Sequence, residues 1–343
     1  MRKVIYTDNC LDNAVLAKAA YSLLRYCENE IAYILDEKFY NRNVVEVTGI
    51  NVLNNIPIIS SLDELEEGVY ELVLGFSPVG GRLSDKQRLV VKKALDRKFK
   101  IINGLHDILE GPIELIENLR MFNDSMKIVA KDFKYRSKIV LPVGTDFSVG
   151  KMTTTIEMNR ALNMNNIKST WIATGQTGMM IQNEGLALDS IPADFFTGNL
   201  EKLVIDKDDD YEVIIVEGQG SHNHCSYSIG PIGFFHTLKP NYLVICHRMG
   251  QEKSSGFDIN LPTVSETISF YEGLGKLLNI NFEILGVSID SSRHSHDDFT
   301  EYRIMLEKEI GYPVFDPVKE VPESVIEKFR KSKLTYKDNL MEG

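Results

Sequence analysis

The sequence of 343 residues lacks several features that mark particular classes of protein. Its four cysteines form no Cys-x-x-Cys pair and its N-terminus has no apolar signal segment, so we expect reduced thiols and a cytoplasmic location. No apolar run is long enough to cross a bilayer. No basic tract is interleaved with aromatic residues, and 49 acidic against 38 basic residues give a net charge of −11. Neither a membrane nor nucleic acid is therefore an expected partner.

The apolar content and the order of segments predict the fold class. Hydrophobic residues make up 43% of the chain, which is ample for two cores, and its length predicts two domains. Strand-like and helix-like segments alternate, which favours two doubly wound α/β domains with mainly parallel sheets. We expect a Rossmann-like domain over 1–112, a connecting helix and linker over 113–136, and a P-loop NTPase-like domain over 137–343.

The first domain has the outline of a dinucleotide-binding domain without its fingerprint. The first strand–helix turn, over 7–13, contains no glycine, although Asp36 at the end of the second strand could pair with a ribose. A later turn is rich in glycine and carries an arginine, which suits an anionic ligand. An ordinary tight turn before the next helix explains it equally well. Its candidate ligand-binding residues are Gly80, Gly81 and Arg82.

The strongest motif in the chain is a phosphate-binding loop. An apolar run stops at Gly144, a small loop follows, and Gly150-Lys151 opens a segment with helical periodicity. Glycines let consecutive N–H groups point into one concavity, the helix start adds its positive dipole, and the lysine supplies a mobile cation. The predicted cofactor-binding residues are Gly144, Thr145, Asp146, Ser148, Val149, Gly150, Lys151, Met152 and Thr153.

This loop departs from the usual pattern in two ways. Five residues rather than four separate its glycines, and Met152 stands where a magnesium-binding hydroxyl is expected. Thr153 or Thr154 could take over that role. Phosphate binding is therefore a stronger prediction than magnesium-dependent phosphoryl transfer.

A second motif supplies a carboxylate near the loop. The apolar strand over 213–216 ends in Glu217-Gly-Gln-Gly220, and a P-loop enzyme uses such a carboxylate to hold magnesium or its water shell. We therefore predict a metal site formed by Thr153 and Glu217. Other strand-end turns carry hydroxyl and amide groups suited to a small substrate, and the candidates are Thr174, Gln176, Thr177, Gln219 and Ser221.

Histidines follow two of the predicted strands in the second domain. His224 and His247 are candidates for general acid or base catalysis, and with Lys151 and Glu217 they complete the predicted catalytic set. Two alternatives remain. One is a zinc site drawn from His222, His224, Cys225 and either Cys246 or His247. The other is a polar lining without a chemical step.

The motifs resemble those of two known families. The P-loop and Glu217-Gly-Gln-Gly220 are similar to the paired motifs of dethiobiotin synthetase over about 138–317. Met152 and the missing lysine-containing substrate turn depart from that family, so biotin synthesis is not expected. A longer series of motifs resembles the DgcN-like family over almost the whole chain. It runs through Gly80-Gly81-Arg82-Leu83, Asn103-Gly-Leu-His106-Asp107, the P-loop with Lys151-Met-Thr-Thr, Thr174-Gly-Gln-Thr-Gly178 and Glu217-Gly-Gln-Gly-Ser221.

The second resemblance implies a Rossmann-like domain joined to a P-loop domain, with Met152 as a family trait. Some members of that family acetylate D-glutamate with acetyl-coenzyme A. The P-loop by itself favours ATP, whereas this resemblance favours acetyl transfer. We expect a nucleotide-binding enzyme, with ATP and magnesium as cofactors, that transfers a group to a small anionic metabolite. The alternatives are an acetyl-coenzyme A-dependent N-acetyltransferase acting on an amino acid and a non-enzymatic, nucleotide-gated sensor. The expected partner is a small amino acid or carboxylate, and a homo-oligomer is compatible with the sequence.

Overall fold

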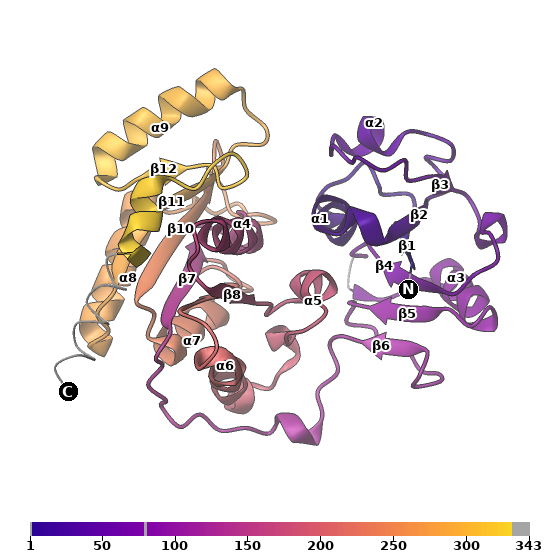
Figure 1. Cartoon of the computed structure of the whole chain (residues 1–343), viewed down its shortest axis with the longest axis horizontal. Helices are drawn as coiled ribbons and strands as arrows, with labels where there is room; N and C mark the ends of the chain where they lie inside the picture. The colour runs from indigo at the N-terminus through magenta and orange to yellow at the C-terminus, as the bar shows by residue number, and fades with distance from the viewer. Residues whose placement is uncertain (1, 79–80, 331–343) are drawn as a thin grey trace. The chain divides into compact units, whose positions relative to one another are not determined.

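The computed structural model describes residues 2–78 and 81–330 (Figure 1). The chain divides into two compact units. The first is formed by Met1–Asn123 with Gly175–Ser190, and the second by Asp124–Thr174 with Ile191–Gly343. Each unit is built on a six-stranded sheet in which every strand pair is parallel, which confirms the predicted α/β class. Within the described part of the chain, no helix is long and apolar enough to span a membrane.

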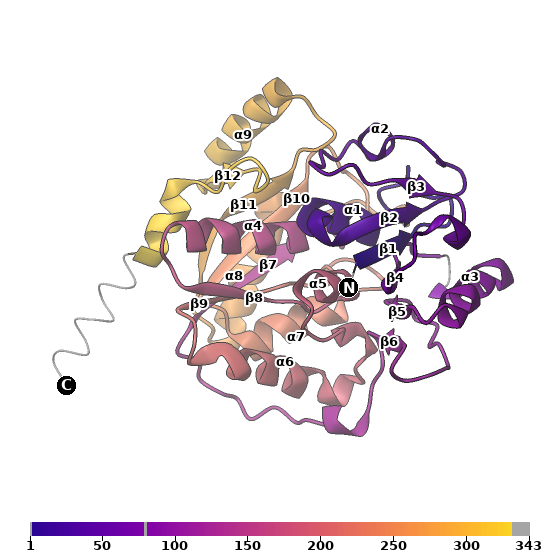
Figure 2. The ribbon, with the colours of Figure 1, turned by 45° about the vertical axis from the view of Figure 1, so that its right-hand side comes forward.

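The sheet of the first unit has the strand order β3-β2-β1-β4-β5-β6, which Figure 2 shows from top to bottom. This is the order of a Rossmann-like sheet, with the change of direction between β1 and β4. The elements are β1 (Arg2–Tyr6), α1 (Lys18–Tyr26), β2 (Ile31–Leu35), α2 (Val44–Thr48), β3 (Ile58–Ile59), β4 (Tyr70–Leu74), α3 (Asp85–Asp96), β5 (Lys100–Asn103), β6 (Ile116–Asn118) and α5 (Gln176–Gln182).

Alternating side chains divide the core of the first unit between the two faces of its sheet. Successive residues of a strand point to opposite faces, so Val4 packs with α3 and Ile5 packs with α1. Met180 of α5 joins the core on the α1 face. The segment 175–190, which follows the strand β8 of the other sheet, is thereby part of the first unit.

Asp36 closes the loop where a dinucleotide would approach the first sheet. Its carboxylate is 1% exposed and accepts hydrogen bonds from Thr7 Oγ1 at 2.6 Å and from the backbone N–H groups of Leu11 at 3.2 Å and Phe39 at 3.3 Å. Asp8 and Asn9 both have left-handed backbone angles, with φ of 46° and 65°. The interpretation of Asp36 as a ribose partner is therefore wrong, because its carboxylate is buried and already accepts three hydrogen bonds within the protein.

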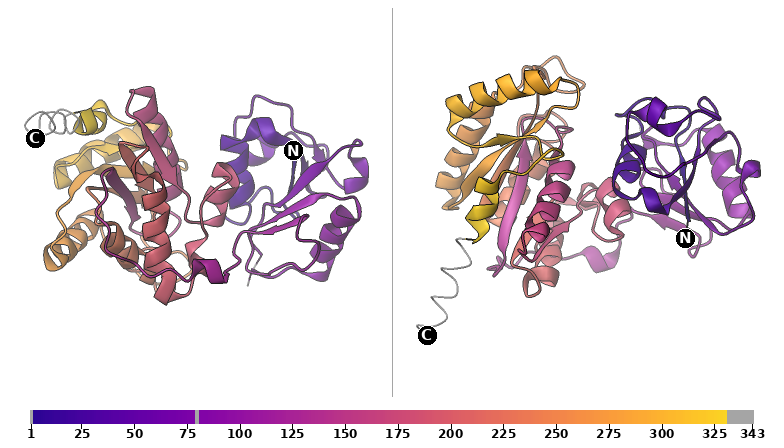
Figure 3. Two further views of the ribbon diagram at one scale, coloured as in Figure 1. Left: turned by 60° about the horizontal axis from the view of Figure 1, so that its bottom comes forward. Right: turned by 45° about the horizontal axis from the view of Figure 1, so that its top comes forward.

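The sheet of the second unit has the order β12-β11-β10-β7-β9-β8, with helices on both faces (Figure 3). β7 lies at its centre, so the loop that follows β7 has the ends of β9 and β10 on either side. The elements are β7 (Lys138–Gly144), α4 (Lys151–Met164), β8 (Ser169–Ile172), α6 (Ala193–Asp208), β9 (Val213–Val216), α7 (Ile229–Leu238), β10 (Tyr242–Arg248), α8 (Val264–Leu278), β11 (Glu283–Asp290), α9 (His296–Ile310) and β12 (Val314–Phe315).

The connecting helix expected within 113–136 does not form. This stretch contains β6 and a single 3₁₀ turn at Asp124–Met126, and the chain then runs without a helix to β7. Its backbone N–H groups are satisfied by buried carboxylates of α6. Glu201 accepts from Lys131 and Phe133, and Asp208 accepts from the residues over 136–137. A helix would leave those two carboxylates buried without partners, and this explains the extended path.

Candidate functional site

The predicted phosphate-binding loop joins β7 to α4. Gly150 caps α4 with a φ of 96°, a left-handed angle that favours glycine. The side chain of Lys151 is buried, and its Nζ donates to the backbone carbonyls of Asp146 at 2.9 Å and Phe147 at 3.2 Å. The loop thus curves around the ammonium group, which lies where it can meet an incoming phosphate.

Two glycines make room for this lysine. A Cβ atom on Gly144 would lie 3.0 Å from Lys151 Nζ and 2.7 Å from the carbonyl oxygen of Asp146. A Cβ atom on Gly218 would lie 2.0 Å from the carbonyl oxygen of Pro142. A small cleft opens between these segments, and it is lined by Pro142, Gly144, Lys151, Gly218, Gln219 and Phe234, among others.

Asp146 anchors the loop rather than facing the cleft. It is fully buried, and its carboxylate accepts from Gln251 Nε2 and from Ser255 N, both at 2.7 Å. Burial raises the pKa of Asp146, but these hydrogen bonds outweigh burial and hold the pKa below its usual value. The carboxylate is therefore ionised and already partnered, and it ties the loop to the segment that follows β10.

Arg248 and Asp290 support the other side of the loop, and the sequence-based site contained neither residue. The guanidinium group of Arg248 donates to the carbonyl of Ser148, and its Nε lies 3.0 Å from Asp290 Oδ2. Burial raises the pKa of Asp290, but hydrogen bonds from Ser292 and Arg248 lower it by more. Arg248 ends β10, which pairs with β7, the strand that leads into the phosphate loop. That position is the feature from which sequence analysis could have predicted its role.

The hydroxyl groups of the first turn of α4 are the possible magnesium ligands at the predicted metal site. Met152 is buried, so an apolar side chain occupies the position of the usual magnesium ligand. Thr154 donates to the carbonyl of Gly150 and Thr155 to that of Lys151, which commits both hydroxyls to the helix. Within residues 2–78 and 81–330, the side-chain hydroxyl of Thr153 has no intramolecular hydrogen-bond partner, so it is the hydroxyl that remains for a ligand.

Glu217 lies at the end of β9 with a buried carboxylate. Its Oε2 accepts from the N–H of Thr174 at 3.1 Å, and Thr174 Oγ1 donates to the carbonyl of Glu217 at 2.6 Å. Gln219 Nε2 donates to Thr174 Oγ1, and Ser221 Oγ lies 3.0 Å from the carbonyl of Gly144. Four predicted residues therefore gather beside the loop. In the described part of the chain, no three histidine, cysteine or acidic side chains are close enough together to hold a metal ion, so the alternative zinc site is not formed.

Five of the predicted binding residues belong to the first unit. Gln176 and Thr177 begin α5, and Gln176 Oε1 accepts from Arg120 Nη2 at 2.8 Å. Gly81 and Arg82 precede α3, and Gly80 lies outside the described residues. The roles assigned to these residues stay predictions.

The two candidate catalytic histidines have different surroundings. The imidazole of His247 is 8% exposed, and its Nδ1 lies 2.9 Å from Thr145 Oγ1 in the phosphate loop. Burial, helped by the charge of Arg248, lowers the pKa of His247 to about 4, so the ring is neutral at pH 7. A neutral imidazole ring therefore lies next to the phosphate loop.

His224 has a partner for each ring nitrogen. Its Nε2 lies 3.2 Å from the carbonyl of Ser255, and its Nδ1 accepts from the N–H of Ser226. This pattern assigns the proton to Nε2. The ring stacks on Tyr227 and meets Phe147 of the loop edge-on. The arrangement favours a role in positioning Phe147, and catalysis by His224 stays a prediction.

The lowered pKa of His247 predicts a pH-dependent stability. The unfolded chain binds a proton at this histidine below about pH 6.5, whereas the folded protein binds one only near pH 4. The folded protein therefore loses stability relative to the unfolded chain as the pH falls from about 6.5 to about 4. Between pH 7.5 and 5 the loss due to His247 is about 2 kcal/mol, and His247→Gln removes it. The measurement is denaturant unfolding followed by the fluorescence of the single tryptophan, Trp171 in β8. If the wild type and His247→Gln lose the same stability between pH 7.5 and 5, the lowered pKa does not belong to His247.

Comparisons with known proteins agree with this architecture. The P-loop domain of DUF1611, a domain of unknown function, matches residues 127–326, and the Rossmann-like domain of the same family matches residues 40–124. A crystal structure of a DUF1611 family protein from Anabaena variabilis is 27% identical, with a TM-score of 0.88, and the match covers 96% of this chain and 100% of that one.

Two curated relatives carry a functional name. A protein from a Pseudoalteromonas species named D-glutamate N-acetyltransferase is 31% identical over 292 residues, which cover 82% of this chain and 88% of the relative. A protein of the same name from Tritonibacter scottomollicae is 34% identical over 261 residues, which cover 73% of this chain and 78% of the relative. The resemblance inferred from the motifs is thereby confirmed: the chain belongs to the DUF1611 family, with a Rossmann-like domain followed by a P-loop domain.

Proposed function

We propose that this protein transfers an acyl group from a nucleotide-containing donor to the amino group of a small anionic amino acid. Acetyl-coenzyme A and D-glutamate are the substrates of first choice. The relatives named D-glutamate N-acetyltransferase support the reaction class. The observation that carries the proposal is the phosphate loop, which has Lys151 at its centre and the buried Met152 in place of the magnesium-binding hydroxyl. Such a loop suits phosphates that bind without a metal ion.

The loop and α4 would hold the phosphates of the donor. Backbone N–H groups at the start of α4 and its positive dipole attract the anion. Lys151 would exchange its contacts with the carbonyls of Asp146 and Phe147 for contacts with phosphate oxygens. Asp146 and Arg248 are already partnered, so they keep the loop in place rather than bind the donor directly.

His247 is the proposed proton acceptor. The uncharged amine nitrogen forms a bond to the carbonyl carbon of the thioester, and the carbon–sulfur bond breaks so that the sulfur leaves as a thiolate. His247 takes the proton that the nitrogen loses and returns it to the thiolate, which gives the free thiol. The surplus proton of the amine needs a neutral base, and His247 is neutral at pH 7 and lies beside the loop. Glu217 accepts hydrogen bonds from both the N–H and the hydroxyl group of Thr174, and it thereby holds this strand end in place beside the loop.

The test is a transfer assay on the purified full chain with acetyl-coenzyme A and a panel of amino acids. We expect N-acetylglutamate by mass spectrometry and an equal amount of free thiol, with D-glutamate preferred over L-glutamate. Removal of divalent cations by EDTA should leave the rate unchanged. If no member of the panel is acetylated and no thiol is released, the proposal is wrong.

A second candidate is an ATP- and magnesium-dependent transfer to a small carboxylate. It is favoured by the hydroxyl of Thr153, which remains for a ligand, and by the carboxylate of Glu217 at the neighbouring strand end. Release of ADP that depends on magnesium and on a carboxylate substrate would support it over acyl transfer. Tight nucleotide binding without any product would instead support a nucleotide-gated sensor.

A further inference from the structure

The first unit contains a pocket that the P-loop chemistry does not use. It lies at the carboxyl ends of β1, β2 and β3, on the face of the sheet that α3 covers, and holds about 510 Å³ including the part open to solvent. Its floor is apolar, because Leu35 and Leu62 are buried beneath it. In open parallel sheets, ligands bind at this edge.

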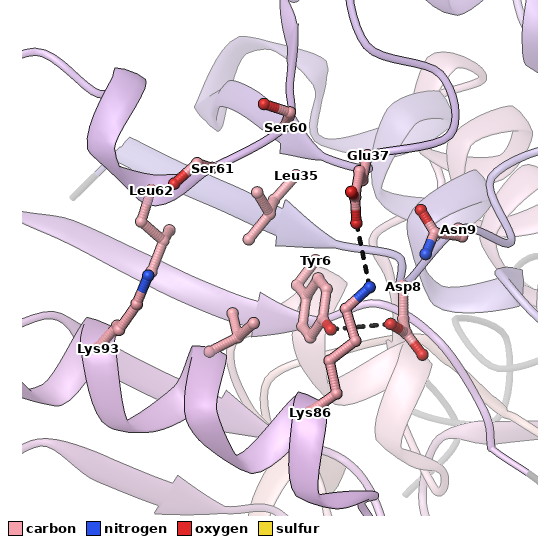
Figure 4. A pocket seen from close by; sticks show the side chains of 11 residues that line it. Tyr6, Asp8, Asn9, Leu35, Glu37, Ser60, Ser61, Leu62, Lys86 and Lys93 are labelled. Atoms are coloured by element: carbon pink, nitrogen blue, oxygen red, sulfur yellow. Dashed lines mark hydrogen bonds and ion pairs between the residues drawn. The ribbon is translucent and has the colours of Figure 1, made fainter.

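Charged groups of opposite sign mark the two ends of the pocket (Figure 4). At one end lie the carboxylates of Asp8 and Glu37, with Lys86 Nζ 3.0 Å from Glu37 Oε2. At the other end lies the ammonium group of Lys93, opposite Ser61. Among the residues that the structure describes, Lys93 has no acidic partner within 4 Å. One end therefore carries a net negative charge and the other a positive charge.

The carboxylate of Asp8 is held in place by its neighbours. Tyr6 Oη donates to Asp8 Oδ1 at 2.9 Å, and the buried Gln87 donates to Oδ2. Burial and the adjacent Asp8 raise the pKa of Tyr6, so the phenol stays protonated and remains a donor. The negative end of the pocket is therefore preorganised, whereas Lys93 has a flexible side chain that can adjust to a ligand.

The charges of the pocket narrow the class of ligand. A simple anion would meet Asp8 and Glu37, and a simple cation would meet Lys86 and Lys93. A dinucleotide needs a glycine-rich loop after β1, and here that loop is closed by Asp36. A molecule with an ammonium group at one end and a carboxylate at the other matches both ends.

We propose that this pocket binds a free amino acid, with its ammonium group at Asp8 and Glu37 and a carboxylate at Lys93. Lys93 follows Lys86 by seven positions, which places the two ends about 10 Å apart along α3, so an extended side chain that carries the second charge fits best. The proposal does not rest on the reaction at the P-loop, because all the groups that form the pocket belong to the first unit.

Calorimetric titration of the full chain tests this proposal with four probes of similar length. They are D-glutamate, L-glutamate, glutarate, which lacks the ammonium group, and 1,5-diaminopentane, which lacks the carboxylates. We expect one or both glutamates to bind at least about tenfold more tightly than the other two, because each missing charge leaves one end unpaired. No binding of either glutamate, or equal binding of glutarate, overturns the proposal.

Matched lysine variants locate the bound amino acid. Lys93→Gln should weaken binding at least about tenfold, and Lys93→Arg should retain it. Lys92→Gln changes an exposed lysine of the same helix that does not line the pocket, and should leave the affinity within about twofold. Equal affinities in Lys93→Gln and Lys92→Gln, or binding lost only in Lys151→Ala, would place the ligand elsewhere and refute the assignment. The last result would still leave acyl transfer at the P-loop open, so the two proposals can fail separately.

Discussion

Lys151→Ala should lower kcat/KM for the transfer reaction by about 100- to 1,000-fold, because a charged donor to the reacting ligand is lost from a buried position. In the structure the ammonium group is buried and lies at the centre of the loop, on the carbonyls of Asp146 and Phe147. No water or flexible side chain can replace a fixed cation there at equal strength. The measurement is steady-state kinetics with calorimetric binding of the donor beside it.

Two further variants separate the charge of this lysine from its packing. Lys151→Met keeps most of the buried volume and should lose as much activity as Lys151→Ala, with a smaller change in stability. Lys276→Ala changes an exposed lysine of α8 and should leave kcat/KM within about twofold. Donor binding by Lys151→Ala within about twofold of the wild type would show that the loop does not hold the phosphates.

Gly218→Ala should destabilise the second unit by about 2–4 kcal/mol and abolish donor binding. Its new Cβ would lie 2.0 Å from the carbonyl oxygen of Pro142 and 3.4 Å from Lys151 Cδ. The first of these atoms belongs to the backbone of the central strand β7, which cannot move without disturbing both neighbouring strands. The strand end and the lysine are therefore expected to shift together. Denaturant unfolding followed by Trp171 fluorescence measures the loss.

Gly273→Ala is the matched control and should have the opposite sign. Gly273 lies within α8, and a Cβ atom there would meet nothing within 4 Å. Alanine in a helix interior is favoured over glycine by up to about 1 kcal/mol, so this variant should be slightly more stable than the wild type. Equal stabilities of the Gly218 and Gly273 variants would contradict the close approach of the turn to β7.

Much of the fold could be predicted because its signals are local. The apolar run before Gly144 and the helical pattern after Lys151 predict the strand, loop and helix of the phosphate site, and the structure has β7 and α4 there. The same holds for β9, which ends immediately before Glu217. The prediction of a connecting helix was wrong because the path of this segment is set by contacts that are distant in the sequence. The path of residues 127–137 depends on carboxylates of α6 about 70 positions away, as in the bond from Phe133 to Glu201.

The sequence by itself determined the two parallel α/β sheets, the phosphate loop and the family, because strand periodicity and loop motifs are properties of consecutive residues. Only the tertiary structure decided which candidate side chains have hydrogen-bonding capacity left. Asp36 and His224 are occupied by their neighbours, whereas the ammonium group of Lys93 has no acidic partner within residues 2–78 and 81–330. The structure also brought Arg248 to Ser148, 100 positions away in the chain. A motif specifies which groups are present, but a buried polar group is satisfied by whatever the fold places beside it, and that partner is seldom near in sequence.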